Sequence, residues 1–380
     1  MSQAYIGLDV HKRTISIAVA FLGNDEPVSY GKCSSDINRF LKILRRLMKK
    51  YSFEKKDIKL CYEAGPCGFV LARHLLRLGF DTVVIAPSLI PRQSGDKFKT
   101  DKRDARKLAR HFRSGNLTTV HIPDESDEVI RDLCRARSDA VDDCRRSRQR
   151  LLSFLLRNGH HYTGKSNWTE AHMRYLRELV LQDPSQKVIL EEYLQTIDRN
   201  MQRVSDLEEN MRTLQADWTR GKFAEALQGF RGFQLIASMI ITSELGDVTR
   251  FDHPRKLMAY LGLVPTEDSS GDRRRQGAIT KCGNSHARWI LVEVAECYRY
   301  DPKISRALSC RQEGLSKAVK ELSWRAQKRL NHRYVRLAMR RLHKNKIKVA
   351  IARELAAFIW ELGQILRKES CIPDSQGYAA

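Results

Sequence analysis

The order of secondary-structure patterns at the start of the chain limits its fold more than any other feature. Residues 4–10 and 14–21 are apolar, β-rich runs joined by the short polar turn HKRT, and a third candidate strand at 27–33 follows the turn GNDEP. Runs of this kind separated by short turns predict an antiparallel meander of three strands. Residues 36–50 then change to helical spacing, with an apolar side chain at every third or fourth position. The chain therefore begins with a sheet that is followed by a helix.

After this helix the pattern alternates. It predicts a strand at 58–62, a helix at 67–79, a strand at 82–86 and a further helix that begins at Asp101. A three-stranded meander followed by alternating helix and strand is the order found in a ribonuclease H-like fold, whose sheet is mixed. The predicted fold class of this part is therefore α/β.

Four acidic residues stand at the ends of these predicted elements. Asp9 ends the apolar run AYIGLDV, and Glu63 ends the run IKLCYEAG. Asp101 and Asp104 lie at the start of the basic helix KTDKRDARKLARHF, and their spacing places both on one helix face. Carboxylates are the ligands that Mg²⁺ prefers, and a bound ion can contact phosphate oxygens. These four residues, the acidic tetrad, predict a magnesium site of a nuclease or a recombinase.

Each acid of the tetrad also has an ordinary structural interpretation. Asp101 and Asp104 follow Thr100, and acids in the first turn of a helix are favoured by its dipole. Asp9 could be a turn former ahead of HKRT, and Glu63 could be a strand-end carboxylate. The metal interpretation is preferred because three separate segments bring acids to one plausible edge of the sheet.

The charge of the chain indicates its partner. The 380 residues include 68 Lys and Arg against 45 Asp and Glu, which gives a net charge of +23 and a pI near 9.8. Such an excess favours polyanions, nucleic acid first and an anionic membrane surface second. No apolar run reaches the roughly 18 residues of a spanning helix, which argues against a membrane partner. The nine cysteines lack zinc spacing and are expected to be reduced thiols of a cytosolic protein.

The middle of the chain predicts long helices. Residues 124–158 and 183–218 carry apolar side chains at heptad-like spacing, which indicates an antiparallel coiled coil or a dimerisation arm. His160 and His161 lie in the break after the first helix, and we interpret them as loop residues because no acid or cysteine is near in sequence. The arginines of the first helix are either a solvated face or a contact surface for nucleic acid.

The third part holds a second candidate for chemistry. Residues 223–263 predict helices, with a glycine turn at Gly229 and Gly232 similar to a helix-hairpin-helix element. The following segment, VPTEDSSGDRRRQGAITKCGNSHARW, places serines next to three arginines. A serine there could attack a phosphodiester while guanidinium groups stabilise the charge, or the segment could be a plain basic linker. The residues predicted to bind nucleic acid are Lys97, Lys99, Lys102, Arg103, Arg273, Arg274, Arg275, Lys281 and Asn284.

Several of these motifs together carry a family resemblance. They are YIGLDVHK, YEAGPCG, PRQSGDKFKTDKRDARKLARHFRSG, FDHPRKLMAYLGLVPTEDSSGDRRRQGAITKCGNSHAR and VAIARELAAFIW. Over nearly its whole length the chain resembles the DEDD-type transposases of bacterial insertion sequences, which are related to Piv-type DNA invertases and described as RNA-guided recombinases. The usual Pro-Gly-Ile-Gly turn of that family is replaced here by Arg231-Gly232-Phe233-Gln234.

The resemblance implies roles for particular residues. It implies a RuvC-like N-terminal domain with its catalytic, metal-binding tetrad at Asp9, Glu63, Asp101 and Asp104. It also implies a C-terminal transposase domain whose nucleophilic serine is Ser270, with Ser269 as the alternative. A structured noncoding RNA that pairs with donor and target DNA is a further implied partner.

These observations lead to one expected organisation. We expect a RuvC-like domain at 1–122, a helical coiled-coil region at 123–220, an all-helical transposase domain at 221–368 and a disordered tail at 369–380. The expected protein is a cytoplasmic, nucleoid-associated homodimer or homotetramer that uses Mg²⁺, DNA and a guide RNA. The alternative function is a metal-dependent Holliday-junction endonuclease that activates water.

Overall fold

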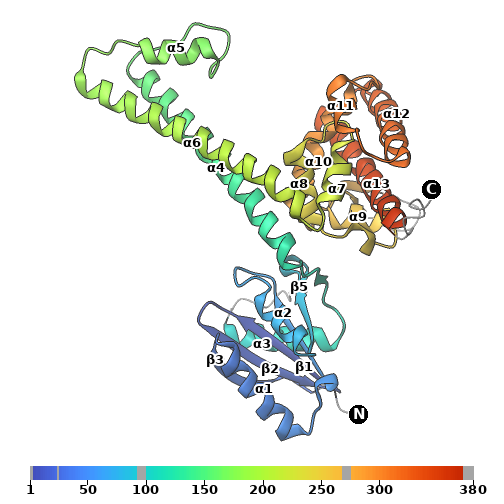
Figure 1. Cartoon of the computed structure of the whole chain (residues 1–380). Coiled ribbons are helices and arrows are strands. Elements are labelled where there is room, and N and C mark those ends of the chain that lie inside the picture. Colours follow the sequence, from blue (N-terminus) through green and yellow to red (C-terminus); the bar gives the residue numbers. More distant parts are fainter. Residues whose placement is uncertain (1–2, 24, 92–99, 268–274, 371–380) are drawn as a thin grey trace, which may run out of the picture. The chain divides into compact units, whose positions relative to one another are not determined.

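The protein consists of two compact units, described here from a computed structural model (Figure 1). The first unit is Met1–Asp124 and the second is Glu125–Ala380. The structure describes residues 3–23, 25–91, 100–267 and 275–370. The expected disordered tail falls almost wholly outside these residues, since the last described helix ends at Ser370.

A mixed six-stranded sheet forms the centre of the first unit. Its strands lie in the order β3-β2-β1-β4-β5-β6. The first three strands pair antiparallel, β4 lies parallel to β1 and to β5, and β6 closes the edge antiparallel to β5. The strands are β1 (Ala4–Val10), β2 (Thr14–Phe21), β3 (Val28–Ser34), β4 (Ile58–Glu63), β5 (Asp81–Ile85) and β6 (Thr119–Val120).

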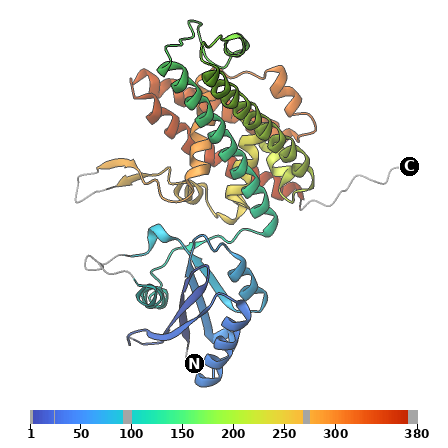
Figure 2. The ribbon, with the colours of Figure 1, turned by 90° about the vertical axis from the view of Figure 1, so that its left-hand side faces the viewer.

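Helices cover both faces of this sheet. Helices α1 (Ile37–Tyr51) and α2 (Val70–Arg77) pack on one face, and α3 (Asp101–Arg113) lies on the other (Figure 2). The first face carries the larger core, in which Phe40 and Leu44 of α1 are buried in one cluster with Ile6 and other sheet residues. The face under α3 is lined by small residues such as Ala18 and Ala20. Two short 3₁₀ helices, Lys55–Asp57 and Pro87–Leu89, complete the unit.

The predicted α/β class and the three-stranded meander are confirmed, and the strand β6 was not predicted. β6 has only two residues, which is too short to produce an alternating pattern. The helix predicted at 67–79 begins at Val70, because the chain makes a turn at Gly65–Gly68 first. The helix that carries Asp101 and Asp104 begins at Asp101, as predicted, and Thr100 is its N-cap.

Gly7 lets α3 lie directly on β1. A Cβ atom at Gly7 would be 2.4 Å from the carbonyl oxygen of Ala105 and 2.5 Å from the amide nitrogen of Ala109. Both atoms belong to the backbone of α3, so they cannot move aside as a flexible side chain does. The close approach of strand and helix therefore depends on a glycine, and it brings the start of α3 to the end of β1.

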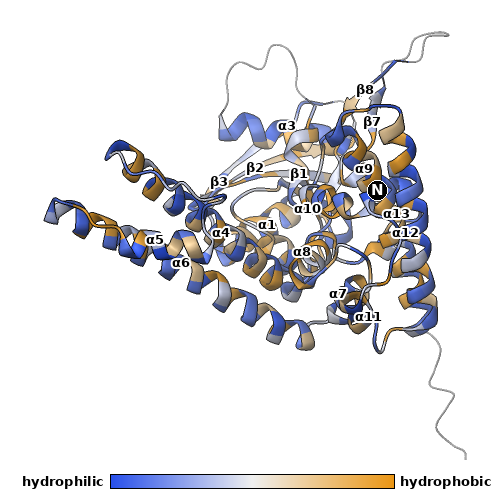
Figure 3. Cartoon of the chain, turned by 90° about the horizontal axis from the view of Figure 1, so that it is seen from above, coloured by the Kyte–Doolittle hydropathy of each residue, from blue (hydrophilic) through white to orange (hydrophobic). Residues whose placement is uncertain are grey.

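Two long helices run alongside each other in the second unit. They are α4 (Glu125–Arg157) and α6 (Pro184–Asp217), and a shorter helix, α5 (Glu170–Glu178), lies between them in sequence. Along both long helices, hydrophilic residues alternate with apolar ones (Figure 3). Leu151, Leu190 and Ile197 belong to a separate small core near α5, whereas Cys134 and Met211 belong to the main core of the unit.

The rest of the second unit is mostly helical and shares that main core. Its α-helices are α7 (Gly221–Gln228), α8 (Leu235–Leu245), α9 (Pro254–Tyr260), α10 (Ser285–Ala295), α11 (Arg306–Arg311), α12 (Lys317–Met339) and α13 (Lys344–Ser370). The 3₁₀ helices are Val248–Arg250 and Glu296–Arg299. No helix among the described residues is long and apolar enough to cross a membrane.

The expectation of an all-helical C-terminal part needs one correction. Strands β7 (Pro265–Glu267) and β8 (Gln276–Ile279) pair antiparallel and extend away from the helices of their unit (Figure 2). Each strand is too short to produce a recognisable alternating pattern, and the pairing joins residues about a dozen positions apart. This pairing brings together the residues that precede and follow the serine-containing segment.

Candidate metal centre

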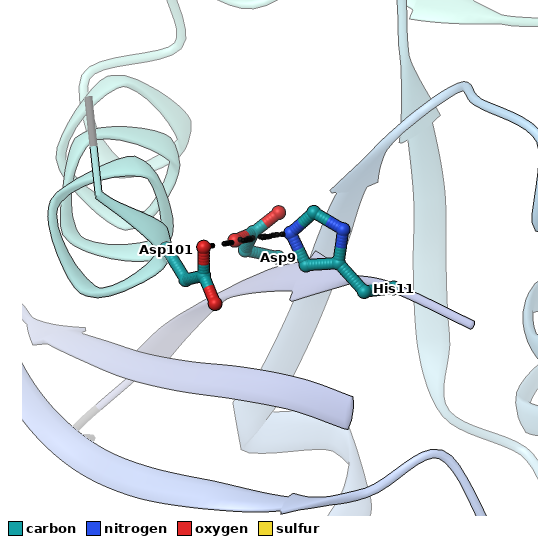
Figure 4. A group of neighbouring side chains, drawn as sticks. All are labelled: Asp9, His11 and Asp101. Atoms are coloured by element: carbon teal, nitrogen blue, oxygen red, sulfur yellow. Dashed lines mark hydrogen bonds and ion pairs between the residues drawn. The ribbon is translucent and has the colours of Figure 1, made fainter. Parts of the chain in front are cut away.

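Asp9, His11 and Asp101 form a compact group in the first unit (Figure 4). One possible ligand atom from each residue lies within 4.8 Å of the other two. The Nε2 atom of His11 is 3.1 Å from Oδ2 of Asp9 and 3.7 Å from Oδ1 of Asp101. Asp9 comes from the end of β1, His11 follows that strand, and Asp101 begins α3. Two carboxylates and an imidazole at this separation can share one cation.

The carboxylates of this group differ in their surroundings. Partial burial raises the pKa of Asp9, the hydrogen-bonded His11 opposes that rise, and the negative charges of Asp101 and Asp104 add to it. Asp101 is more exposed, and Nζ of Lys32 on β3 lies 2.9 Å from its Oδ2. This lysine lowers the pKa of Asp101. The negative charges of the acids repel one another. The hydrogen bond between His11 and Asp9 and the ion pair between Lys32 and Asp101 offset part of this repulsion.

Glu63 and Asp104 lie outside the compact group. Glu63 is exposed at the end of β4, one residue beyond the register pair Leu8 and Tyr62. Since Asp9 follows Leu8, Asp9 and Glu63 occupy neighbouring positions on adjacent parallel strands, where backbones are roughly 4.8 Å apart. Asp104 lies one turn after Asp101 on α3 and acts on Asp9 through its charge. The described structure therefore brings two tetrad residues together and places the other two beside them.

His11 is a site residue that the sequence interpretation missed. The turn HKRT was considered only as a connection between strands, although the histidine stands two positions after Asp9. Within the motif YIGLDVHK that position was visible, and a histidine so close to a candidate ligand is a usable signal. The role of Lys32 had no such signal, because β3 meets α3 only in the folded unit.

The residues predicted to bind nucleic acid are only partly described. Lys102 and Arg103 are exposed on the first turn of α3, next to Asp101. Arg275 is exposed just before β8, and Lys281 is exposed just after it. Ser269, Ser270, Lys97, Lys99, Arg273 and Arg274 lie outside the described residues.

Asn284 has a structural position. Its Oδ1 accepts a hydrogen bond from the amide of Ala287 and so caps α10, and its Nδ2 donates to Glu244 at 2.7 Å. Both ends of the amide therefore have a protein partner, which gives Asn284 a structural role in its own unit.

The turn at Arg231–Gln234 is packed against its own unit. Gly232 has a φ of 87°, and a Cβ there would lie 2.9 Å from Cγ1 of Val294. The guanidinium of Arg231 donates to the carbonyl oxygens of Tyr300 and Asp301. The first glycine of the altered turn therefore has a packing role, while Arg231 is bound to backbone.

Glu244 is the centre of a buried charged network in the second unit. Its side chain is 1% exposed. Arg135 donates to both carboxylate oxygens, at 3.2 and 3.3 Å, and Arg131 lies 3.5 Å away. Nδ1 of His286 is 3.3 Å from Oε1. Burial alone would raise the pKa of Glu244, but the hydrogen bonds from His286 and Asn284 and the charges of Arg135 and Arg131 outweigh it and lower the pKa to about 2. The carboxylate is therefore ionised, and it joins α4 and α8 to the start of α10.

Comparisons with known proteins agree with these features. The IS110-type DEDD transposase family, described as "Transposase", matches residues 6–159, and the "Transposase IS116/IS110/IS902 family" matches residues 224–309. The "Putative transposase y4qE" of Sinorhizobium fredii is 40% identical over 368 residues, which are 96% of this chain and 90% of that protein. The "Transposase for insertion sequence element IS1533" of Leptospira borgpetersenii is 30% identical over 352 residues, 89% of this chain and 98% of its own length. The chain belongs to the IS110/IS116 family of insertion-sequence transposases, enzymes that act on DNA.

Proposed function

We propose that this transposase cuts and rejoins DNA strands through a phosphoserine intermediate, with a magnesium ion held by the acidic tetrad of a RuvC-like domain. The observation that carries the proposal is the meeting of Asp9 and Asp101, from a strand end and a helix start, with His11 between them. Transposases of the DEDD type normally use a divalent metal ion, and the chain belongs to that type.

The donor set of the candidate metal centre suits a divalent cation. Asp9 and Asp101 would hold the ion, with Glu63 and Asp104 as the further carboxylates nearest in the fold. Bringing several carboxylates together is unfavourable unless a cation balances their charge. When bound, the ion would supply positive charge that stabilises the phosphate oxygens during strand cleavage. Lys102 and Arg103, at the start of the same helix, would contact the DNA backbone beside it.

Ser270 would be the nucleophile, with Ser269 as the alternative. Its Oγ attacks the phosphorus, so that an Oγ–P bond forms while the bond from phosphorus to the leaving deoxyribose oxygen breaks. The serine proton passes to a carboxylate, for which Asp101 and Asp104 are the candidates, and the leaving oxygen takes up a proton. Attack by the hydroxyl of the new strand reverses these changes and releases the serine. No ATP is needed, because each step exchanges one phosphodiester bond for another and the number of such bonds stays the same.

The reaction requires the acidic tetrad and the serine to meet, although they belong to different units of the chain. They would meet within one chain or between the copies of a homodimer or homotetramer. A guide RNA that pairs with donor and target DNA would select the site, and the net charge of +23 supports a second polyanionic partner. Sequencing of the RNA that copurifies with the full chain tests this part, and recovery of only random cellular RNA would count against it.

A covalent adduct is the expected sign of the serine reaction. Incubation of the full chain and its copurified RNA with end-labelled donor DNA and Mg²⁺ should give protein-linked DNA that survives denaturation. The adduct should be lost in Ser270→Ala, because that variant has no Oγ to bond to phosphorus. Ser269→Ala should keep the adduct. Free 5′-phosphate ends without any adduct would instead support the endonuclease that activates water, and loss of the adduct in Ser269→Ala alone would move the nucleophile to that residue.

A further inference from the structure

Trp289 is an exposed aromatic residue on α10, in the helical unit that contains the serine segment (α10 in Figure 1). Its side chain is 54% exposed, although tryptophan buries a large apolar area when a core is available. Its ring is stacked on that of His286, with centroids 6.0 Å apart and planes inclined by only 12°. Single exposed apolar residues are common, but a half-exposed tryptophan ring that is aligned by a neighbouring ring presents an outer face on which another ring can stack.

The orientation of this ring pair is set by the buried network of Glu244. Nδ1 of His286 lies 3.3 Å from the ionised carboxylate of Glu244, which fixes the plane of the imidazole. Asn284 holds the same carboxylate and caps α10, so the first turn of the helix is tied to the core at two points. A rigid stacking surface loses less conformational entropy on binding than a mobile side chain does. The network therefore holds the first turn of α10 and the His286 ring in a fixed orientation before a ligand binds.

Two exposed cationic side chains are linked to the ring pair, one through Glu244 and one along the chain. The side chain of Arg135 is 53% exposed and contacts the same carboxylate as His286. Lys281, also exposed, lies five residues before His286, at the base of the β7–β8 pair. Hydrogen bonds fix that base to its unit. The backbone N–H of Lys281 donates to the carbonyl oxygen of Gly262, and the guanidinium of Arg288 donates to the carbonyl oxygens of Leu261 and Cys282. Aromatic rings among cations are the combination that binds an unpaired base and its phosphate.

We propose that Trp289 and His286 form a stacking site for an unpaired base of the DNA strand that is cut. Stacking with an unpaired base adds affinity without reading its identity, whereas a base inside a duplex has both faces covered. The site would hold an unpaired base of that strand on the same unit of the chain that contains Ser270. The choice of the cut strand rests on the proposed function, but the binding of an unpaired base does not.

Binding of short DNA by the full-length protein tests the stacking site. The probes are a fluorescent duplex with a central bubble of unpaired bases and the same duplex fully paired. Trp289→Ala should weaken binding to the bubble by about tenfold, as expected for the loss of one aromatic–base stack, and leave the paired duplex unchanged. Because no charge is removed, the dependence of affinity on salt should stay the same. Trp289→Phe should restore most of the lost affinity.

Tyr300→Ala is the matched control, since Tyr300 is an equally exposed aromatic residue of the same unit (55%) and should leave both affinities unchanged. Unchanged bubble binding by Trp289→Ala, or equal loss on both probes, would overturn the proposal. A single-stranded RNA is the third probe, and a loss confined to it would also overturn the proposal, because the site would then serve RNA. All binding measurements are repeated in the Ser270→Ala background, which cannot form the proposed serine adduct. The test of base stacking then does not depend on whether the serine reaction takes place.

Discussion

Replacement of Asp9 by Asn is expected to reduce DNA strand cleavage about a thousandfold or more, the effect of losing several kcal/mol of charge stabilisation at the phosphate. Asn keeps the size of the side chain but removes the negative charge that faces His11 and Asp101. The measurement is the single-turnover cleavage rate of donor DNA at saturating Mg²⁺, together with calorimetric titration of the ion. Asp9→Asn should show weaker ion binding as well as slower cleavage.

Asp81→Asn is the control for this experiment. Asp81 is exposed and is the first residue of β5. Because β5 runs parallel to β4, this residue lies at the opposite end of the sheet from the carboxyl ends of β1 and β4. The same chemical change there should leave both ion binding and cleavage at the wild-type level. Wild-type cleavage by Asp9→Asn, in a variant whose thermal unfolding is unaltered, would show that the candidate metal centre has no part in the reaction.

Replacement of Glu244 by Ala is expected to destabilise the second unit by about 3 kcal/mol, because it leaves the largely buried Arg131 without its counter-charge. Arg135 adds less, since its side chain is 53% exposed and remains solvated. Glu244→Gln should cost less, since an amide keeps the volume and some of the hydrogen bonds. All five tryptophans lie in the second unit, namely Trp168, Trp218, Trp289, Trp324 and Trp360. Denaturant unfolding followed by tryptophan fluorescence therefore reports this unit alone.

The contribution of Glu244 to the free energy of unfolding of the second unit should also depend on pH. Its pKa is lowered from an ordinary value of 4.5 to about 2 in the folded protein, so the folded state favours the ionised form. The stabilisation is complete above about pH 4.5 and is lost as the pH falls toward 2. The difference in stability between the wild type and Glu244→Gln should therefore shrink over that range. Glu225→Gln, an exposed change on α7, should follow the wild type throughout. A constant gap between the wild type and Glu244→Gln would show that the charge of Glu244 is not what stabilises the unit.

Much of the first unit could be predicted from local pattern. The apolar runs that became β1 and β2 are long and bounded by short polar turns, and Thr100 caps a helix that begins at Asp101. Such signals lie within a few residues of one another. The strands β6, β7 and β8 were missed because two to four residues carry no periodic signal. Their pairing depends on partners elsewhere in the chain.

The buried network of Glu244 shows why the second unit was harder to predict. Glu244 lies in the apolar run LIASMIITSEL of α8, where nothing nearby in sequence announces a charged partner. Arg135 is 109 residues away and Asn284 is 40 residues away. The arginines of α4 were considered as a solvated face or a surface for nucleic acid, and that alternative does not include the buried partner that the structure gives to Arg131 and Arg135.

By itself the sequence determined the basic charge, the α/β class of the first unit and the acids at the ends of its elements, because these follow from composition and from spacing along a strand or helix. Only the tertiary structure decided which acids meet. Asp101 reaches Asp9 because Gly7 lets the backbone of α3 approach β1. His11 joins them from the turn after β1, and Lys32 joins them from β3. Close packing between elements distant in sequence sets such distances to within an ångström, and no local pattern carries that information.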